Sequence, residues 1–258
     1  MLVSNAPDLN HAVRDTFIIP DGTAAKMTII AGPEDQRPSP NAFIVEQSPH
    51  SKAQAHFHNN SQFQVVVTGS GKIGTHAVAP LSLHYAGQQT AYGPIVAGDD
   101  GITYMTLRGI MEDNAFLLPE AKVFIDRKIP KYQTYTPIVA PATRETLDQL
   151  AAPELQEMIP PQSGGLAAWL IRVPAGQRVT PPAHENGAGR YYLVIEGALE
   201  LSTDILTRFG CAWLNPDEVE TPVVAASGGV ELLVLQFPAN AWAFQPASRA
   251  VHQDRAGA

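Results

Sequence analysis

The chain has 258 residues, of which 45% are hydrophobic and 16% charged, so it has ample apolar material for a core and no bias towards disorder. Its 25 acidic residues outnumber the 17 basic ones, and the formal net charge of −8, with no segregated basic patch, argues against nucleic-acid binding. No stretch approaches the roughly 18 apolar residues of a membrane span or the apolar core of a signal peptide. The single Cys211 fits a reducing compartment, so we expect a cytoplasmic protein.

Short apolar runs rich in Val, Ile, Leu and Tyr recur along the chain, separated by Gly, Pro, Asn and Asp. This pattern is typical of antiparallel β-sandwiches and barrels. Only segment 142–159, ATRETLDQLAAPELQEMI, has a helical pattern, and because Pro153 interrupts it we expect one or two short helical turns there. In chain order, the predicted strands are 26–30, 42–47, 64–69, 101–109, 167–173, 191–197, 198–203 and 230–237.

The sequence repeats itself at an offset of 128 residues. AHFHNNSQFQVVVTG (55–69) lies over AHENGAGRYYLVIEG (183–197), and GPIVAGDDGITYMTL (93–107) lies over TPVVAASGGVELLVL (221–235), without a gap. Ten of the 53 aligned positions from 55 to 107 are identical, and most of the others pair apolar with apolar residues. The offset is about half of the chain length, so the simplest interpretation is two copies of one β-domain.

We therefore predict three parts. The N-terminal domain spans 1–135, a linker with short helical turns spans 136–164, and the C-terminal domain spans 165–258.

The first copy contains two histidines placed to act together. His56 and His58 are two residues apart in an extended segment, so both side chains project from the same face of the strand. With Gln62 and Gly69, they resemble the first motif of the cupin superfamily, His-x-His, three or four residues, Glu, six residues, Gly. This sequence departs from the motif at Gln62, which replaces the Glu, and at His50, which replaces a preceding glycine.

The resemblance implies an all-β fold of two tandem cupin-like barrels, also described as double-stranded β-helices or jelly rolls. A chain of this kind is a bicupin. In the family, the two histidines, the Glu and a histidine from a second motif hold a divalent metal. The C-terminal copy also shows the second motif, Gly-x5-Pro, as Gly210 and Pro216.

In the C-terminal copy the metal-binding residues are largely replaced. An arginine is always protonated and offers no lone pair, so Arg190 cannot be a ligand and would repel a divalent cation. We expect no metal in this barrel, which is either structural or dimer-forming, or uses His184 and Arg190 to line a pocket for an anion. The family's ligand positions hold His184, Asn186, Arg190 and Thr221 here.

In the N-terminal copy, the offset places the fourth ligand at Gly93, which has no side chain to coordinate a metal. His84 and Tyr92 are the candidates to replace it. With one of them, a site for Fe, Mn, Ni or Zn is chemically reasonable, although an amide oxygen is a weaker ligand than a carboxylate. Alternatively, the histidines line a polar ligand pocket without metal. The candidate metal ligands are His56, His58, Gln62, His84 and Tyr92.

Three functions remain open. The first is a metal-dependent enzyme, of oxygenase, isomerase or hydrolase type, acting on a small organic molecule in the N-terminal barrel. The second is a non-catalytic, small-molecule-binding or regulatory bicupin without metal, and the third is a structural or storage role. The sequence identifies neither catalytic residues nor an organic cofactor. The resemblance also implies that the N-terminal stretch adds an edge strand to the opposite barrel, and open edges of this kind favour a homodimer.

Overall fold

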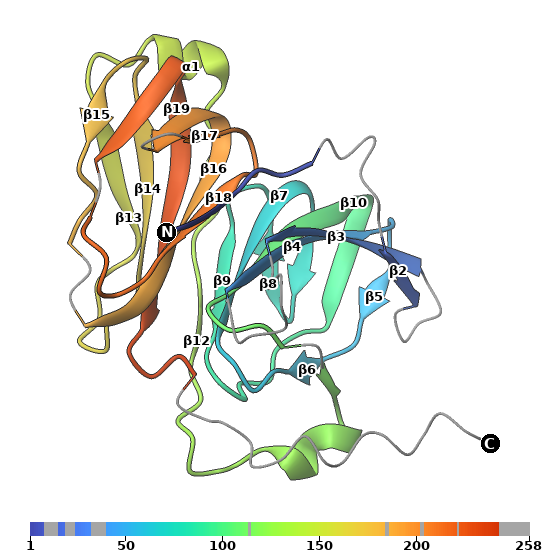
Figure 1. The fold of residues 1–258 in the computed structure, drawn as a ribbon. Helices are drawn as coiled ribbons and strands as arrows, with labels where there is room; N and C mark the ends of the chain where they lie inside the picture. Colours follow the sequence, from blue (N-terminus) through green and yellow to red (C-terminus); the bar gives the residue numbers. More distant parts are fainter. Residues whose placement is uncertain are drawn as a thin grey trace.

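The structure is a computed structural model, which describes residues 1–7, 15–18, 24–31, 40–112, 115–183, 186–201, 204–220 and 222–242 (Figure 1). Within these residues, most regular structure is strand, as the apolar runs predict, and two large antiparallel sheets form, each largely from one half of the chain. No helix in the described part of the chain is both long and apolar enough to cross a membrane.

The sheet of the N-terminal half has the order β12-β9-β7-β10-β4-β3-β2, with β8 beside β7 and β5 beside β10. Its strands are β2 (Asp15–Ile18), β3 (Ala24–Ala31), β4 (Asn41–Gln47), β5 (Lys52–Ala53), β7 (Gln62–Ile73), β8 (His76–Val78), β9 (Leu83–Ala86), β10 (Ile95–Arg108) and β12 (Gln133–Tyr135). A short ladder pairs β6 (His56–Phe57) with β11 (Phe116–Leu117), and the 3-10 helix η1 (Glu120–Phe124) follows.

The sheet of the C-terminal half has the order β1-β18-β16-β19-β14-β13, with β15 beside β19 and β17 beside β16. Its strands are β1 (Leu2–Ser4), β13 (Glu154–Ile159), β14 (Ala167–Val173), β15 (Arg178–Val179), β16 (Gly187–Leu201), β17 (Asp204–Leu206), β18 (Cys211–Leu214) and β19 (Val223–Pro238). The N-terminal strand β1 pairs with β18, so the predicted crossing of the N-terminal stretch to the opposite half is confirmed.

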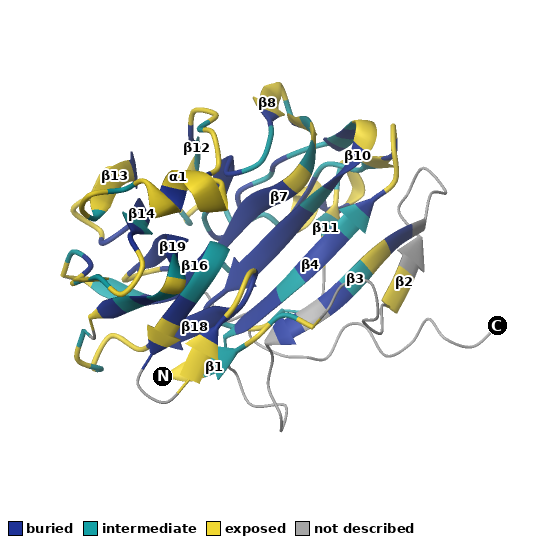
Figure 2. Ribbon diagram, turned by 90° about the horizontal axis from the view of Figure 1, so that it is seen from above, coloured by how far each residue is buried: buried dark blue, intermediate teal, exposed yellow. Residues whose placement is uncertain are grey.

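The two sheets share one hydrophobic core, and strand periodicity decides which side chains enter it. Along β7, Phe63 and Val65 point into this shared core, whereas Val66 points into the interior of the N-terminal half. The rings of Phe63 and Phe237 on β19 meet at 4.9 Å between centroids. Figure 2 shows the buried strands of the two sheets side by side.

The 128-residue repeat is visible in the strand register. Gln62 pairs with Arg108 across β7 and β10, and at the offset positions Arg190 pairs with Gln236 across β16 and β19. Both register shifts of the β7–β10 ladder recur at equivalent residues of the β16–β19 ladder, which has one further shift between Gly187 and Gly189. The two halves therefore share one pattern of strand pairing.

The repeated glycines are required by the backbone. Gly69 has a φ of +71°, and a Cβ atom there would lie 2.2 Å from the carbonyl oxygen of Gly101. Gly197 has a φ of +77°, and its Cβ would lie 2.1 Å from the equivalent oxygen of Gly229. A side chain at either position would add both left-handed backbone strain and a clash with rigid backbone.

We expect Gly197→Ala to lower the free energy of unfolding by about 3 kcal/mol, because left-handed strain and overpacking each cost roughly 1–3 kcal/mol. Gly164→Ala is the matched control, since nothing lies within 4 Å of its added Cβ. Urea denaturation of both variants tests this expectation. Equal stabilities would show that the backbone crossing at the repeated glycine tolerates a side chain.

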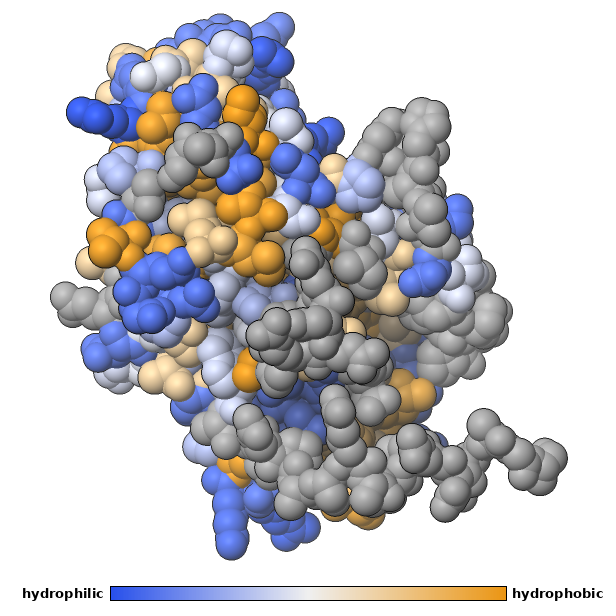
Figure 3. Space-filling view, in the orientation of Figure 1, coloured by the Kyte–Doolittle hydropathy of each residue, from blue (hydrophilic) through white to orange (hydrophobic). Residues whose placement is uncertain are grey.

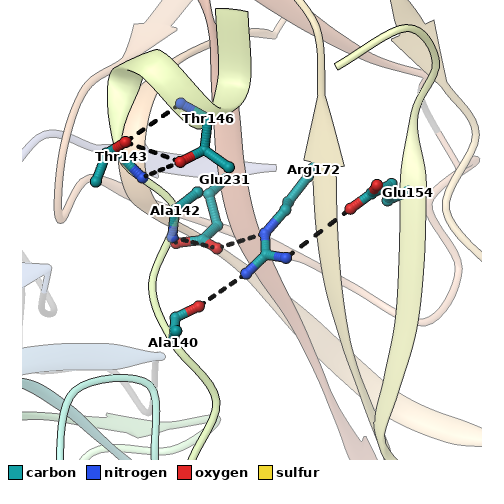
Figure 4. A network of polar contacts seen from close by, with 7 residues as sticks. All are labelled: Ala140, Ala142, Thr143, Thr146, Glu154, Arg172 and Glu231. Atoms are coloured by element: carbon teal, nitrogen blue, oxygen red, sulfur yellow. Dashed lines mark hydrogen bonds and ion pairs between the residues drawn. The ribbon is translucent and has the colours of Figure 1, made fainter. Parts of the chain in front are cut away.

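The linker is attached to the C-terminal sheet by a buried carboxylate (Figure 4). Glu231 on β19 is fully buried, and its carboxylate accepts hydrogen bonds from the backbone N–H of Ala142, at 3.0 and 3.1 Å, and from Nε of Arg172, at 2.8 Å. Nη2 of Arg172 donates to the carbonyl of Ala140 at 2.9 Å. Glu231 thereby fixes the chain just before the helix α1 (Arg144–Asp148).

The helical prediction for 142–159 is only half right. α1 is one short helix, and the side chain of Thr143 caps it by accepting a hydrogen bond from the N–H of Thr146. After Pro153 the chain forms β13, not a second helical turn, because Glu154–Ile159 hydrogen-bonds to β14 and becomes the edge strand of the sheet. The predicted linker therefore contributes a strand to the C-terminal sheet.

Candidate functional site

The N-terminal half contains a pocket of about 660 Å³. Alternation along the strands positions its walls, since every second residue of β4 and β10 faces the interior. Apolar atoms make up most of the surface that the pocket exposes. Its polar floor is formed by His56, His58, Gln62, Gln64, Tyr92, Tyr104 and Arg108.

The structure brings four of the five predicted ligands into this pocket. His56 and His58 lie with their ring centroids 5.2 Å apart, and Gln62 and Tyr92 lie beside them. The fifth, His84 on β9, lies deeper, with its ring 4.9 Å from that of Tyr92. Its Nδ1 is 2.8 Å from Gln64 Oε1 and its Nε2 is 3.3 Å from Gln133 Oε1. A side-chain amide therefore faces each ring nitrogen, and the single N–H of a neutral imidazole donates to one of the two oxygens.

Four of the pocket residues form a directional relay of hydrogen bonds. Nδ1 of His56 lies 2.7 Å from the backbone carbonyl of Gln54, which can only accept, so Nδ1 carries the proton. Nε2 of His56 must then accept from the hydroxyl of Tyr92, 2.7 Å away. Gln62 in turn donates through Nε2 to the Tyr92 oxygen at 2.5 Å and accepts through Oε1 from Nε of Arg108 at 3.0 Å.

Arg108 is the residue of this candidate site that the sequence did not reveal. Arg108 is 4% exposed, and its guanidinium lies at the floor of the pocket, beside two of the predicted metal ligands. Besides its bond to Gln62, it places Nη2 3.1 and 3.3 Å from the two ring nitrogens of His58, donates through Nη1 to the carbonyl of Glu112 at 2.6 Å, and stacks over Phe43. The signal was present in the repeat, which places Arg108 over Gln236 and Gln62 over Arg190.

The C-terminal half has the same arginine–glutamine pair with the two residues exchanged. Nη2 of Arg190 donates to Oε1 of Gln236 at 2.6 Å, and Nη1 forms an ion pair of 3.2 Å with Glu220. Arg190 is fully buried and Nη1 also donates to the carbonyl of Pro182. The partners shown for Arg190 are thus protein groups, and its predicted role in a ligand pocket gains no support from this geometry. His184 lies outside the described residues.

Burial sets the protonation of the relay. It lowers the pKa of His56, against the hydrogen bond to the Gln54 carbonyl, and the charge of Arg108 lowers it further. Burial also raises the pKa of Tyr92 well above its usual range. Near neutral pH the imidazole is therefore neutral and the phenol protonated, as the direction of the relay requires.

This arrangement does not fit a divalent metal. A metal ligated by His56 would need the single free lone pair of Nε2, which here accepts a hydrogen bond from Tyr92, and Gln62 Oε1 already accepts one hydrogen bond from Arg108. The guanidinium would also repel the cation, and a protonated phenol is a poor ligand. In the described part of the chain, no three His, Cys, Asp or Glu side chains are grouped closely enough to hold a metal ion.

His84 makes stability depend on pH. Burial lowers its pKa from 6.5 to about 4, so the unfolded chain binds a proton more readily than the folded chain between these values. The stability contributed by neutral His84 is present above pH 6.5 and is lost as the pH falls to about 4, a loss of about 3 kcal/mol. Urea denaturation across this pH range should show a smaller loss of unfolding free energy for His84→Gln than for the wild type. Equal losses in the two proteins would contradict the role of buried, neutral His84 in this pH dependence.

No protein-family model matches the sequence, and the search of curated proteins finds no match. Solved structures do match. Oxalate decarboxylase from Lactobacillus farciminis, in complex with formate, aligns with a TM-score of 0.57 at 10% identity over 92% of this chain and 87% of that one. Oxalate decarboxylase from Bacillus subtilis aligns with a TM-score of 0.56 at 12% identity, over 92% of this chain and 78% of that one. A proposed dioxygenase from Nostoc punctiforme aligns with a TM-score of 0.55 at 11% identity, over 91% of this chain and 82% of that one.

These likenesses concern the fold. The predicted all-β, cupin-like fold is confirmed, and it extends over most of the chain. At such low identity, the residues of the pocket must carry any argument about function.

Proposed function

We propose that the protein binds a small organic anion in the pocket of its N-terminal half, with Arg108 as the binding cation and without a metal ion. The observation that supports this proposal best is the position of the Arg108 guanidinium, between His58 and Gln62 at the pocket floor. A buried guanidinium in an apolar pocket favours a carboxylate partner, because the planar group can donate two parallel hydrogen bonds.

The C-terminal half supplies an internal comparison. There, Arg190 has an ion pair with Glu220. The residue at the offset position in the N-terminal half is Tyr92, which brings no charge to Arg108. The carboxylate of Glu112 also lines this pocket and accepts the backbone N–H groups of Asn59 and Asn60, both at 2.9 Å. Burial raises the pKa of Glu112, and the charge of Arg108 acts in the opposite direction. The ion pair of Arg190 with Glu220 shows that a buried arginine of this arginine–glutamine pair accommodates a carboxylate, as Arg108 would in binding a ligand carboxylate.

The proposal is tested by metal content together with ligand binding. Protein purified without a metal-affinity column should contain well under one metal ion per chain by elemental analysis. Exhaustive treatment with a chelator should leave the thermal stabilisation by small carboxylates unchanged, because a ligand of the folded state raises Tm by mass action. One metal ion per chain, whose removal abolishes carboxylate binding, would contradict the proposal.

A metal-dependent enzyme, of oxygenase, isomerase or hydrolase type, is the second candidate. One line of support is that His56 and His58 line the same pocket, as the motif predicts. The other is the fold shared with oxalate decarboxylase, since one of the matching structures of that enzyme concerns its Mn(II) centres. In this alternative, Arg108 must turn away before a metal binds. Arg108→Ala would then raise the metal content of the protein, whereas under our proposal it leaves the protein without metal.

The homodimer remains a proposal. Figure 3 shows hydrophobic residues gathered on the C-terminal half, where the exposed Leu2 and Ile205 lie on the neighbouring strands β1 and β17. Light scattering coupled to size exclusion should give twice the mass of the chain. The cytoplasmic location also remains a prediction.

A further inference from the structure

The pocket is polar at both ends of one strand and apolar between them. The side chains of β4 that line it are Asn41, Phe43, Val45 and Gln47, in strict alternation. Asn41 lies directly opposite Arg108 in the ladder, whereas Gln47 lies opposite Ile102. At about 3.3 Å per residue, the Cα atoms of Asn41 and Gln47 are roughly 20 Å apart.

Within the described part of the chain, Gln47 differs from the other residues of this wall in having two unpaired polar atoms, whereas Asn41 has one, Oδ1. It is only 4% exposed, yet neither its amide nitrogen nor its amide oxygen has a hydrogen-bond partner among the described residues. Buried polar groups are nearly always paired, and an unpaired group costs stability. Because Gln47 lines the pocket, a bound molecule is the partner that would satisfy both atoms.

The wall between the two polar ends is apolar. Phe43 and Val45 form it on β4, and Tyr104 adds its ring from β10. At the rim, Met111 and Leu117 are 39% and 38% exposed, although both line the pocket. A ligand with an apolar body would cover these side chains and gain the corresponding free energy of burial.

We infer that the ligand is an elongated monocarboxylic acid with an apolar body and a neutral hydrogen-bonding group, such as a hydroxyl, at its far end. The carboxylate binds Arg108, the body lies along Phe43 and Val45, and the terminal group pairs with the Gln47 amide. The terminal group is neutral because the amide offers one acceptor and one donor group, and a hydroxyl can use both. This inference rests on the proposed anion site at Arg108.

The test is calorimetric titration of the full chain with ω-hydroxyoctanoate, octanoate, the dicarboxylate suberate and oxalate. We expect ω-hydroxyoctanoate to bind about 10-fold more tightly than octanoate, the gain expected from one added hydrogen bond in a buried site. Suberate and oxalate should bind more weakly than octanoate. Gln47→Leu should abolish the difference between the first two acids and raise the Tm of the free protein, because it removes two unpaired buried atoms.

The outcomes separate the two proposals. If oxalate binds best, Arg108→Gln weakens it and Gln47→Leu has no effect, the ligand class is wrong but the anion site stands. If none of the acids binds, or if Arg108→Gln leaves their affinities unchanged, the anion site itself fails. Gln47→Met, which retains the length of the side chain, supplies the same comparison should the leucine variant not fold.

Discussion

Arg108→Gln is expected to weaken the binding of small carboxylates by about 100-fold. A hydrogen bond to a charged group contributes roughly 1.5–3 kcal/mol, and the variant removes the charge while retaining a side chain that can pair with Gln62. Titration calorimetry measures the effect. Arg108→Lys should retain part of the affinity, because it preserves the charge but not the planar fork.

Arg190→Gln is the matched control for this variant. It makes the same chemical change at the equivalent pair in the C-terminal half, where Arg190 has its ion pair with Glu220. It should lower stability, because Glu220 loses its buried partner, but it should leave carboxylate affinity unchanged. An equal loss of affinity in both variants would point to a general effect on folding, not to a binding site at Arg108.

Glu231→Ala is expected to lower the free energy of unfolding by about 3 kcal/mol. The substitution removes a fully buried carboxylate and leaves both the N–H of Ala142 and Nε of Arg172 without their acceptor. The two halves should remain folded at lower temperature, because their shared core does not include Glu231. Urea denaturation followed by circular dichroism measures the loss.

Glu154→Ala provides the comparison for Glu231→Ala. Glu154 contacts the same arginine, Arg172, but its side chain is exposed and its ion pair is 3.9 Å long. A surface pair of this kind contributes about 0–1 kcal/mol. Should both variants lose the same stability, the attachment of the linker through the buried carboxylate would be incorrect.

The fold was predictable because its signals are local or periodic. Alternating apolar residues predict the strands β7 and β10. The 128-residue repeat predicts that their pairing recurs in β16 and β19. The stretch after Pro153 was mispredicted because its apolar residues have helical spacing. In the structure, backbone pairing with β14 stabilises it as a strand.

The candidate site was predictable only in part. The His-x-His spacing correctly places His56 and His58 in one pocket, and Tyr92 was a candidate for the same cluster. Arg108 was missed because it ends an apolar strand far along the chain, and only the ladder between β7 and β10 brings it to Gln62. The chemistry of the pocket thus depends on strand register, which a motif search does not reveal.

The exchange of arginine and glutamine between the halves explains why Gln62 replaces the expected glutamate. An amide can accept from Arg108 and donate to Tyr92 at once, whereas a carboxylate can only accept. With glutamate at this position, Tyr92 would have to donate to the carboxylate, and Nε2 of His56 would lose its hydrogen bond. The donor and acceptor groups of Gln62 therefore fit a hydrogen-bond relay better than they fit a metal site.

The most direct test of the central claim is a crystal structure of the protein grown with octanoate, with anomalous data collected at the absorption edges of Mn, Fe, Ni and Zn. Our account predicts carboxylate density within hydrogen-bonding distance of the Arg108 guanidinium and no anomalous peak beside His56 and His58. An anomalous peak coordinated by both histidines, with Arg108 turned out of the pocket, would contradict it.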